Sequence, residues 1–242
     1  MTEPLLFAAT RVSTFAGSQS LTAASGFFFR RDRRLFLITS RHVLIDEPNG
    51  HHPDRVELVL HTDPVNLTRT AIMNVPLYAG GLSAWRQGSD SGGEIDVAAL
   101  ELDPGLLPRG AVLHAFTPEH LEPNLDEVGI GAPLLIVGFP LGFYDTVHYL
   151  PVARQATIAS AFGVRFQERG YFLTDARTHR GTSGAPVVMR HAEEGQALQW
   201  RLLGIHSARI DVSSREEGVD ESLGLNCAWY ADFLGTLTAD GG

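Results

Sequence analysis

The sequence predicts an all-β protein, because short apolar segments recur along the chain, turn residues separate them, and glycine is abundant. Among the 242 residues, 44% are hydrophobic, 25 are glycine and 13 are proline, while only 19% are charged. This balance is typical of a turn-rich globular protein and excludes a disordered or collagen-like chain. A chain of this length buries enough apolar surface to fold without disulfides or metals. We expect strands at 26–29, 35–38, 56–60, 97–102, 134–137, 157–160, 171–174, 186–189 and 202–206.

The segments between and after these strands predict the rest of the organisation. The arginine cluster at 30–34 is flanked by apolar runs, which predicts a solvated hairpin turn around Asp32. The stretch 103–131 has weak periodicity and several prolines, which predicts a connector between two halves of the chain. The segment 229–237 places apolar residues at helical offsets, so we expect a C-terminal helix that packs against the rest of the protein.

Charge and cysteine content exclude several classes of protein. The formal net charge of −9 repels nucleic acid and anionic membranes, so neither is expected as a partner. Cys227 is the only cysteine, so no intramolecular disulfide can form. The N-terminus does not read as a secretory signal, and no apolar run has transmembrane length. We therefore expect a cytoplasmic protein.

Three residue types that support nucleophilic catalysis occupy suggestive positions. His42 follows an expected strand directly, where a turn can hold an imidazole rigidly. Asp96 opens an apolar strand, where a buried carboxylate needs a partner such as an imidazole N–H. Ser183 stands between Gly181 and Gly184, which allow backbone N–H groups to converge beside the hydroxyl as an oxyanion hole requires. Taken singly, each residue also has a purely structural interpretation as a core histidine, a turn-capping aspartate or part of a plain β-turn.

The order of the three residues favours a catalytic interpretation. His42, Asp96 and Ser183 follow one another in the same order as the histidine, aspartate and serine of the chymotrypsin triad. In an α/β-hydrolase the serine comes first and lies within Gly-x-Ser-x-Gly. Here Ala185 breaks that motif, and the expected elements lack alternating helices. The α/β-hydrolase fold is therefore a poor alternative.

Five ordered blocks of sequence carry a resemblance to a known family. The blocks are ITSRHV at 38–43, DVAAL at 96–100, VGFP at 137–140, TDA and GTSGAP within 174–186, and LGIHS at 203–207. Over nearly its whole length the chain resembles the trypsin-like serine peptidases, especially the disulfide-free bacterial branch with the HtrA-type and glutamyl endopeptidase groups. The resemblance implies two antiparallel six-stranded β-barrels of the chymotrypsin type, at about 5–118 and about 128–226, and a C-terminal helix at about 227–238.

The resemblance also implies roles for single residues. Ser183 would attack a peptide carbonyl, His42 would take the proton of the serine, and Asp96 would orient the imidazole and stabilise its cation. The backbone N–H groups of Gly181 and Ser183 would form the oxyanion hole. A polypeptide is the implied substrate, and no cofactor is needed. Thr182 stands where activatable trypsins have an aspartate, so activation through a newly cleaved N-terminus is not expected.

Thr178, His206 and Ser207 are candidates for substrate binding. Thr178 and His206 are similar to the primary pocket of the glutamyl endopeptidases, and Ser207 matches a position that often supports the triad aspartate. Nearby arginines would make this region positive, which favours an acidic residue before the scissile bond. In the alternative interpretation, His206 is a hydrogen-bonded core residue. The arginines are Arg177, Arg180 and Arg209.

No metal site is expected. His51, His52 and His61 lack a helix-borne His-Glu-x-x-His pattern or a cysteine cluster, and we interpret them as solvated loop histidines. Cys227 lies in an apolar setting, where a thiol is inert.

A second class of function stays open. The chain can also be a catalytically latent or inactive protease-fold protein that acts as a binding module. A regulatory protein partner is a further hypothesis, because a trypsin-like domain in the cytoplasm must be restrained. Two features discriminate between these alternatives: the direction of the Gly181 N–H, and the reach of His42 to Ser183 and Asp96.

Overall fold

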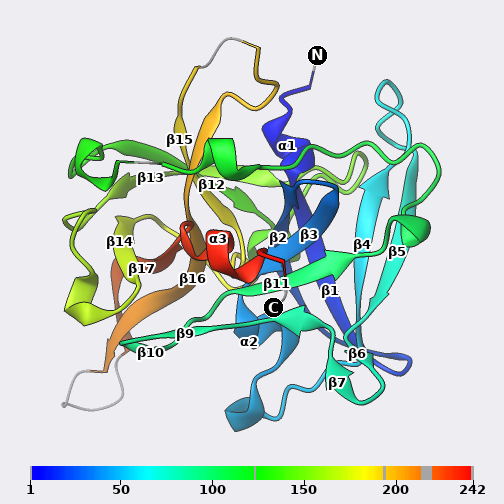
Figure 1. Cartoon of the computed structure of the whole chain (residues 1–242), viewed down its shortest axis with the longest axis horizontal. Helices are drawn as coiled ribbons and strands as arrows, with labels where there is room; N and C mark the ends of the chain where they lie inside the picture. The colour runs from blue at the N-terminus through cyan, green and yellow to red at the C-terminus, as the bar shows by residue number, and fades with distance from the viewer. Residues whose placement is uncertain (1, 123, 193–194, 214–219, 241–242) are drawn as a thin grey trace.

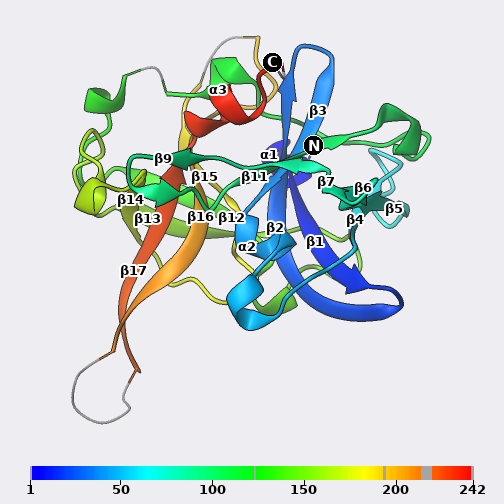
Figure 2. The same cartoon turned by 60° about the horizontal axis from the view of Figure 1, so that its bottom comes forward.

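The computed structural model describes residues 2–122, 124–192, 195–213 and 220–240, and it confirms the all-β prediction. The strands form two groups, one from each half of the chain (Figure 1, Figure 2). The stretch between the two groups, from 103 to 132, contains only turns, isolated bridges and short 3₁₀-helices in its described part. Residues of the two groups meet around His42, Asp96 and Ser183.

The N-terminal half forms a seven-stranded antiparallel sheet with the hydrogen-bonded order β5-β4-β1-β2-β3-β11-β8. Strand β2 is long enough to pair with β1 through its first part and with β3 through its last part. A core of aliphatic side chains, with Phe28, Met73 and Trp85, fills this half. The strands are β1 (Ala9–Ala16), β2 (Gln19–Arg31), β3 (Arg34–Thr39), β4 (Arg55–His61), β5 (Thr70–Pro76), β8 (Trp85–Arg86) and β11 (Ala98–Leu102).

The C-terminal half is a closed barrel with the order β12-β13-β14-β17-β16-β15, and β15 pairs back with β12. Each of the six strands therefore has a hydrogen-bonded neighbour on both sides. Inside it, Phe162, Phe172 and Tyr230 pack with ring centroids 4.7 to 5.2 Å apart. The strands are β12 (Pro133–Gly138), β13 (Val152–Ile158), β14 (Tyr171–Asp175), β15 (Pro186–Arg190), β16 (Trp200–Ser213) and β17 (Asp220–Tyr230).

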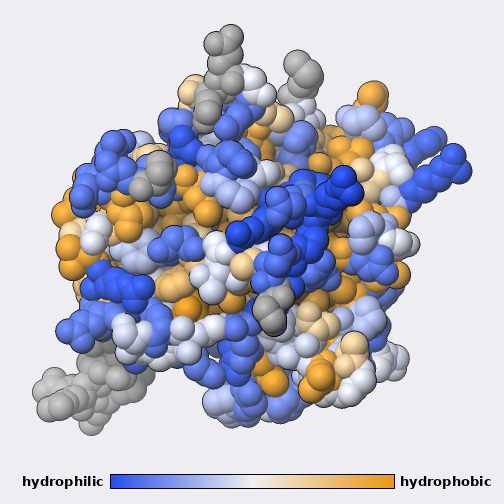
Figure 3. All heavy atoms as spheres, in the orientation of Figure 1, coloured by the Kyte–Doolittle hydropathy of each residue, from blue (hydrophilic) through white to orange (hydrophobic). Residues whose placement is uncertain are grey.

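A separate apolar core joins the two halves. It combines side chains of β2 and β3 with side chains of the barrel, and helix α3 (Phe233–Leu237) adds Leu234 and Leu237 to it. The face that carries α3 mixes hydrophobic and hydrophilic residues, with a compact strongly hydrophilic group near its centre (Figure 3). The joining residues include Phe27, Phe29 and Ile38 from the sheet and Val137, Val188 and Ile205 from the barrel.

The arginines of the β2–β3 turn hold the segment that contains α3. Arg31 donates through Nη1 to the carbonyl of Gly235, and Arg34 donates through Nη2 to the carbonyl of Thr238 at 2.7 Å. Arg34 also pairs with Asp240 at 2.9 Å. Cationic donors at the end of a helix satisfy carbonyls that have no partner within it. The arginine cluster is therefore a docking point, and not simply the solvated turn that the sequence predicts.

The remaining elements are short. Residues of β6 pair with β7, and residues of β9 pair with β10. No helix among the described residues is both long and apolar enough to cross a membrane. These elements are α1 (Leu5–Ala8), α2 (Arg41–Leu44), η1 (Glu47–Asn49), β6 (Tyr78–Ala79), β7 (Leu82–Ser83), β9 (Ser89–Asp90), β10 (Gly93–Glu94), η2 (Pro104–Leu106), η3 (Pro118–His120), η4 (Leu125–Glu127), η5 (Pro140–Gly142) and η6 (Phe166–Glu168).

The C-terminal helix is shorter than predicted. We expect a helix over about 227–238, but β17 continues to Tyr230 and α3 begins only at Phe233. Trp229 pairs with Tyr171 on one side and with Ile205 on the other. Hydrogen bonds to two neighbouring strands outweigh the helical spacing of the apolar residues here.

The connector is anchored on the sheet at Phe116. Its N–H donates to the carbonyl of Phe28 at 2.9 Å, and its carbonyl accepts from the N–H of Arg30 at 2.7 Å. The side chain is fully buried and meets Phe27 edge to face, with ring centroids 5.6 Å apart.

We expect Phe116→Ala to lower the free energy of unfolding by roughly 3–5 kcal/mol, because it removes a fully buried aromatic ring. Urea unfolding monitored by circular dichroism measures the loss. Phe143→Ala is the control, since Phe143 is 69% exposed, and it should change stability by at most roughly 0.5 kcal/mol. Equal losses in the two variants would contradict the anchoring role of Phe116.

Candidate active site

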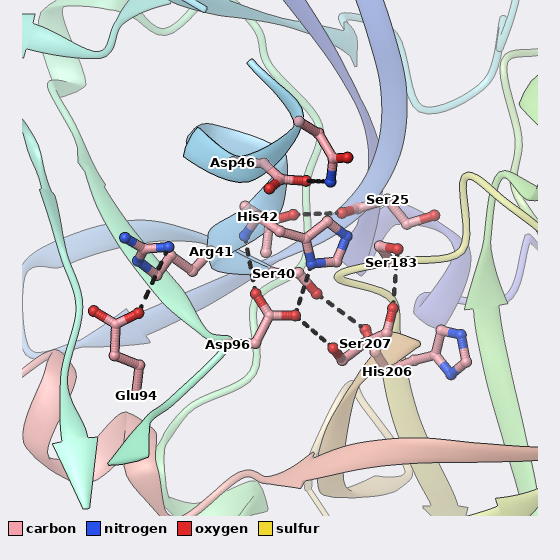
Figure 4. Close-up of polar contacts among 12 residues, drawn as sticks. Ser25, Ser40, Arg41, His42, Asp46, Glu94, Asp96, Ser183, His206 and Ser207 are labelled. Atoms are coloured by element: carbon pink, nitrogen blue, oxygen red, sulfur yellow. Dashed lines mark hydrogen bonds and ion pairs between the residues drawn. The ribbon is translucent and has the colours of Figure 1, made fainter. Parts of the chain in front are cut away.

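The register between β3 and β11 brings Asp96 against His42. Ala98 pairs with Thr39 in this antiparallel ladder, so residues just before β11 lie opposite residues just after β3. His42 is the second residue of the short helix α2, which begins at that point. The backbone N–H of His42 donates to Asp96 Oδ1 at 2.9 Å, and its Nδ1 lies 2.7 Å from Asp96 Oδ2 (Figure 4). The two contacts orient the imidazole and leave its Nε2 for another partner.

Ser207 supplies a third hydrogen bond to the same carboxylate. Its hydroxyl donates to Asp96 Oδ2 at 2.5 Å. Ser207 belongs to β16 in the barrel, whereas His42 and Asp96 belong to the N-terminal half. The side chain of Ser207 is therefore engaged with Asp96, as its matched position implies, and its carbonyl faces Ser183.

Opposing effects act on the pKa of His42, and their sum raises it above the ordinary value. Burial, the largest single effect, lowers the pKa of His42, while the hydrogen bond to Asp96 and the charge of that carboxylate raise it, with a smaller contribution from Asp46. The side chain of His42 is 39% exposed, so these effects are screened by water. Asp96 thus stabilises the protonated imidazole.

Ser183 sits at the corner of a tight turn between β14 and β15. The N–H of Ala185 donates to the carbonyl of Thr182 at 2.9 Å and closes the turn. Gly184 has a φ of 84°, which favours glycine at this position. Ser183 lies next to the imidazole of His42, but its hydroxyl donates to the carbonyl of Ser207 at 3.0 Å (Figure 4). Within the described residues, the serine and the histidine face one cleft without a hydrogen bond between them.

Two backbone N–H groups of the loop that carries Ser183 stay unpaired within the described residues. The N–H of Leu141 donates to the carbonyl of Arg180 at 2.5 Å. Because a trans peptide is planar, the N–H of Gly181 in that same peptide points the opposite way. Neither this N–H nor that of Ser183 has an acceptor within the described part of the chain. An anion beside Ser183 would therefore find two unpaired donors.

Two hollows take part of their lining from the segment 175–183, which includes Ser183. One is lined by residues 22–24 together with His42, Arg180, Gly181 and Ser183. The other is lined by residues 175–179 with Gly224 and Asn226.

Thr178 lines the second hollow, but His206 does not. The hydroxyl of Thr178 donates to the side-chain oxygen of buried Asn226. His206 is only 2% exposed, and its Nδ1 has no hydrogen-bond partner within the described residues. Burial and the neighbouring charge of His42 lower the pKa of His206 to about 4, so its ring is neutral at neutral pH. This geometry fits the alternative of a core histidine better than a carboxylate ligand.

Positive charge at the second hollow comes from arginines. Arg177 lines this hollow and is exposed, and Arg154 Nη2 donates to the carbonyl of Arg177 at 2.6 Å. Within the described residues neither guanidinium forms an ion pair, although the carboxylate of Asp175 also lines the hollow. Arg180 lines the first hollow, and the side chain of Arg209 lies outside the described part.

Sequence reasoning missed three residues that shape the site. Ser25 contacts the loop of Ser183, Asn226 holds Thr178, and Leu141 holds the peptide before Gly181. Asn226 was detectable in principle as a polar residue inside an apolar strand. The contacts of Ser25 and Leu141 cross between distant segments and have no local signal.

The structure also tests the histidines and the cysteine. Within the described residues, no group of three or more His, Cys, Asp or Glu side chains is arranged to hold a metal ion. His61 is wrongly predicted as a solvated loop residue: it is 6% exposed in β4, and its Nε2 lies 2.6 Å from the carbonyl of His148. Burial raises the pKa of Cys227 to about 11, which keeps the thiol protonated and unreactive at neutral pH.

Comparisons with known proteins agree with this architecture. A family model described as a trypsin-like peptidase domain matches residues 24–197. The fold is similar to that of the HtrA-type protease AlgW with tripeptide, with a TM-score of 0.57 and 18% identity, covering 96% of this chain and 59% of that chain. It is also similar to a serine endoprotease from Yersinia pestis, with a TM-score of 0.55 and 18% identity, covering 96% of this chain and 62% of that chain.

The chain thus spans about three fifths of the length of each of these solved structures. A search of curated protein sequences finds no match.

Replacing Asp96 with Asn should lower the pKa of His42, because the negative charge that raises it is lost while the burial that lowers it remains. Titration of the imidazole by NMR measures the change. His114, whose pKa is lowered by burial alone, is the internal control and should titrate as in the wild type. A pKa of His42 that is unchanged in Asp96→Asn would show that Asp96 does not govern it.

Proposed function

Because the chain belongs to the trypsin-like peptidase family, we propose that it is a serine endopeptidase whose catalytic residues are His42, Asp96 and Ser183. The observation that carries the proposal is the convergence of a serine, an acid-bound imidazole and two unpaired N–H groups on one cleft. An endopeptidase needs these elements together, and the substrate is a polypeptide.

The proposed reaction begins with a rotation of the Ser183 hydroxyl from the carbonyl of Ser207 towards Nε2 of His42. The serine oxygen then bonds to the peptide carbonyl carbon while His42 takes its proton. The carbonyl oxygen becomes an oxyanion, which the N–H groups of Gly181 and Ser183 stabilise. Loss of one such donor costs on the order of 10² to 10³ in rate.

The second half of the reaction regenerates the enzyme. His42 gives the proton to the leaving amine as the carbon–nitrogen bond breaks, and the acyl group stays on Ser183. A water molecule then attacks the acyl carbon while His42 takes a proton from the water. The bond between the acyl carbon and Ser183 Oγ breaks, His42 returns the proton to Ser183, and the acid product leaves. Asp96 holds the imidazole and stabilises its cation in both halves.

An acidic residue before the scissile bond is the proposed preference. Support comes from Arg177 and Arg154, whose guanidinium groups have no carboxylate partner within the described residues. An incoming carboxylate would provide one. His206 does not support this preference, because its ring is buried outside the lining of the hollow.

A latent state is the second candidate. It is favoured by one observation: the Ser183 hydroxyl donates to the carbonyl of Ser207 and not to His42. In such a state the protein would bind polypeptides, or a regulatory partner, without cleaving them. Hydrogen bonds of catalytic groups are often long or absent until substrate binds, so we favour the active enzyme.

Incubation with a fluorophosphonate probe tests the proposed nucleophile without any assumption about the substrate. We expect one adduct on the wild-type protein by intact mass and none on Ser183→Ala, because only an activated serine displaces fluoride from the probe. Ser13→Ala, which changes a serine in β1 on another part of the chain, serves as the control and should keep the adduct. A wild type that stays unlabelled would support the latent binding protein instead.

Arg177→Ala should reduce kcat/KM for peptides with Glu or Asp before the scissile bond by roughly 5-fold, which corresponds to about 1 kcal/mol for an exposed ion pair. For peptides with a neutral residue before the scissile bond, kcat/KM of the variant should stay within about twofold of the wild-type value. A peptide library read by mass spectrometry compares these rates, with the exposed Arg109 of the connector changed to alanine as a matched control. Equal losses for acidic and neutral peptides would count against the acidic preference.

A further inference from the structure

Ser25 is a buried residue to which the mechanism above assigns no role. It lies in β2 of the N-terminal half and has no exposed surface. Its backbone N–H donates to the carbonyl of Ser183 at 3.0 Å, and its own carbonyl accepts from the hydroxyl of Thr39 at 2.8 Å. Ser25 is therefore fixed between the sheet and the loop that carries the nucleophile.

The side chain of Ser25 connects two segments of the C-terminal half. Its Oγ donates to the carbonyl of Gly181 at 2.7 Å and accepts from the backbone N–H of Phe139 at 2.9 Å. A serine hydroxyl has one proton, so the donor is fully used and its direction is determined. The two bonded segments are the loop of Ser183 and the segment that supplies Leu141.

Gly181 is consequently anchored on both sides. The peptide before it is held by the N–H of Leu141, and the carbonyl after it is held by Ser25. Gly181 has a φ of 88°, and a Cβ atom there would lie 2.6 Å from the carbonyl oxygen of Phe139. Only glycine fits, yet glycine is also the residue with the most backbone freedom. Anchors on both neighbouring peptides remove that freedom and set the direction of the Gly181 N–H.

We propose that Ser25 is a positioning residue for the oxyanion hole, because its hydroxyl holds the Gly181 N–H in the direction that meets the carbonyl oxygen of the substrate. The inference rests on the proposed endopeptidase function. A merely structural role, in which Ser25 only joins the two halves, would change how many molecules are folded and not how fast each folded molecule reacts.

The fluorophosphonate reaction separates these two roles, because its phosphoryl oxygen gains negative charge where the oxyanion would form. Intact mass followed over time gives the rate constant of labelling and the final labelled fraction. We expect Ser25→Ala to react roughly 10- to 100-fold more slowly than the wild type, less than the full loss of a donor, and to reach the same final fraction. Thr238→Val is the matched control, since Thr238 is fully buried and donates to the carbonyl of Leu234 at 2.6 Å. It should label at the wild-type rate.

Ser25→Cys keeps the shape of the side chain but hydrogen-bonds weakly, so it serves if Ser25→Ala does not fold, and slow labelling to the full fraction is again expected. A wild-type rate in the Ser25 variants, or a reduced final fraction at the wild-type rate, would overturn this inference and leave the proposed function standing. An unlabelled wild type would overturn both.

Discussion

The close approach of Gly184 to the N-terminal sheet is the constraint on which the site depends. A Cβ atom at this position would lie 2.2 Å from the carbonyl oxygen of Ser25 and 2.3 Å from the hydroxyl oxygen of Thr39. The absence of a side chain lets the turn of Ser183 pack directly on β2 and β3. Since His42 follows β3, this contact also sets the separation between the serine and the imidazole. Ser183 and His42 belong to different halves of the chain, so noncovalent packing between the halves determines their separation.

Two histidines beside this contact have opposite protonation behaviour for physical reasons. His42 is partly exposed and bound to a carboxylate, so its pKa rises, whereas the burial of His206 and the charge of His42 lower the pKa of His206 to about 4. The raised pKa of His42 favours its protonated form, whereas the ring of His206 stays neutral at neutral pH. Because the buried His206 stays neutral, no positive charge is placed in the interior of the barrel, where an unpaired charge would lower the stability of the fold.

Much of the fold could be predicted from the sequence, because all nine expected segments coincide at least in part with strands. The sequence analysis does not predict β1, β5 and β17, nor the two-residue strands β6 to β10. In β1, Thr10 and Thr14 occupy buried positions, so no apolar run marks the strand.

His42, Asp96 and Ser183 were placed by the order of their motifs, and their roles remain a proposal. The sequence gives no indication of Ser25, because its hydroxyl contacts lie more than a hundred positions away along the chain. Contacts of that kind depend on how the two halves pack and not on local pattern.

The segment around α3 contacts both the core shared by the two halves and the N-terminal sheet. Leu234 and Leu237 of this segment lie in the core shared by both halves. The guanidinium groups of Arg31 and Arg34, from the N-terminal sheet, donate hydrogen bonds to carbonyls of the segment. His42 and Asp96 lie within one half, so their pairing does not need this segment. The contacts of Ser183 with Ser25, and of Ser207 with Asp96, span both halves and so rely on the packing of the halves, to which this segment contributes two leucines. The segment around α3 thus contributes to the alignment of Ser183 and His42 without contacting either of them.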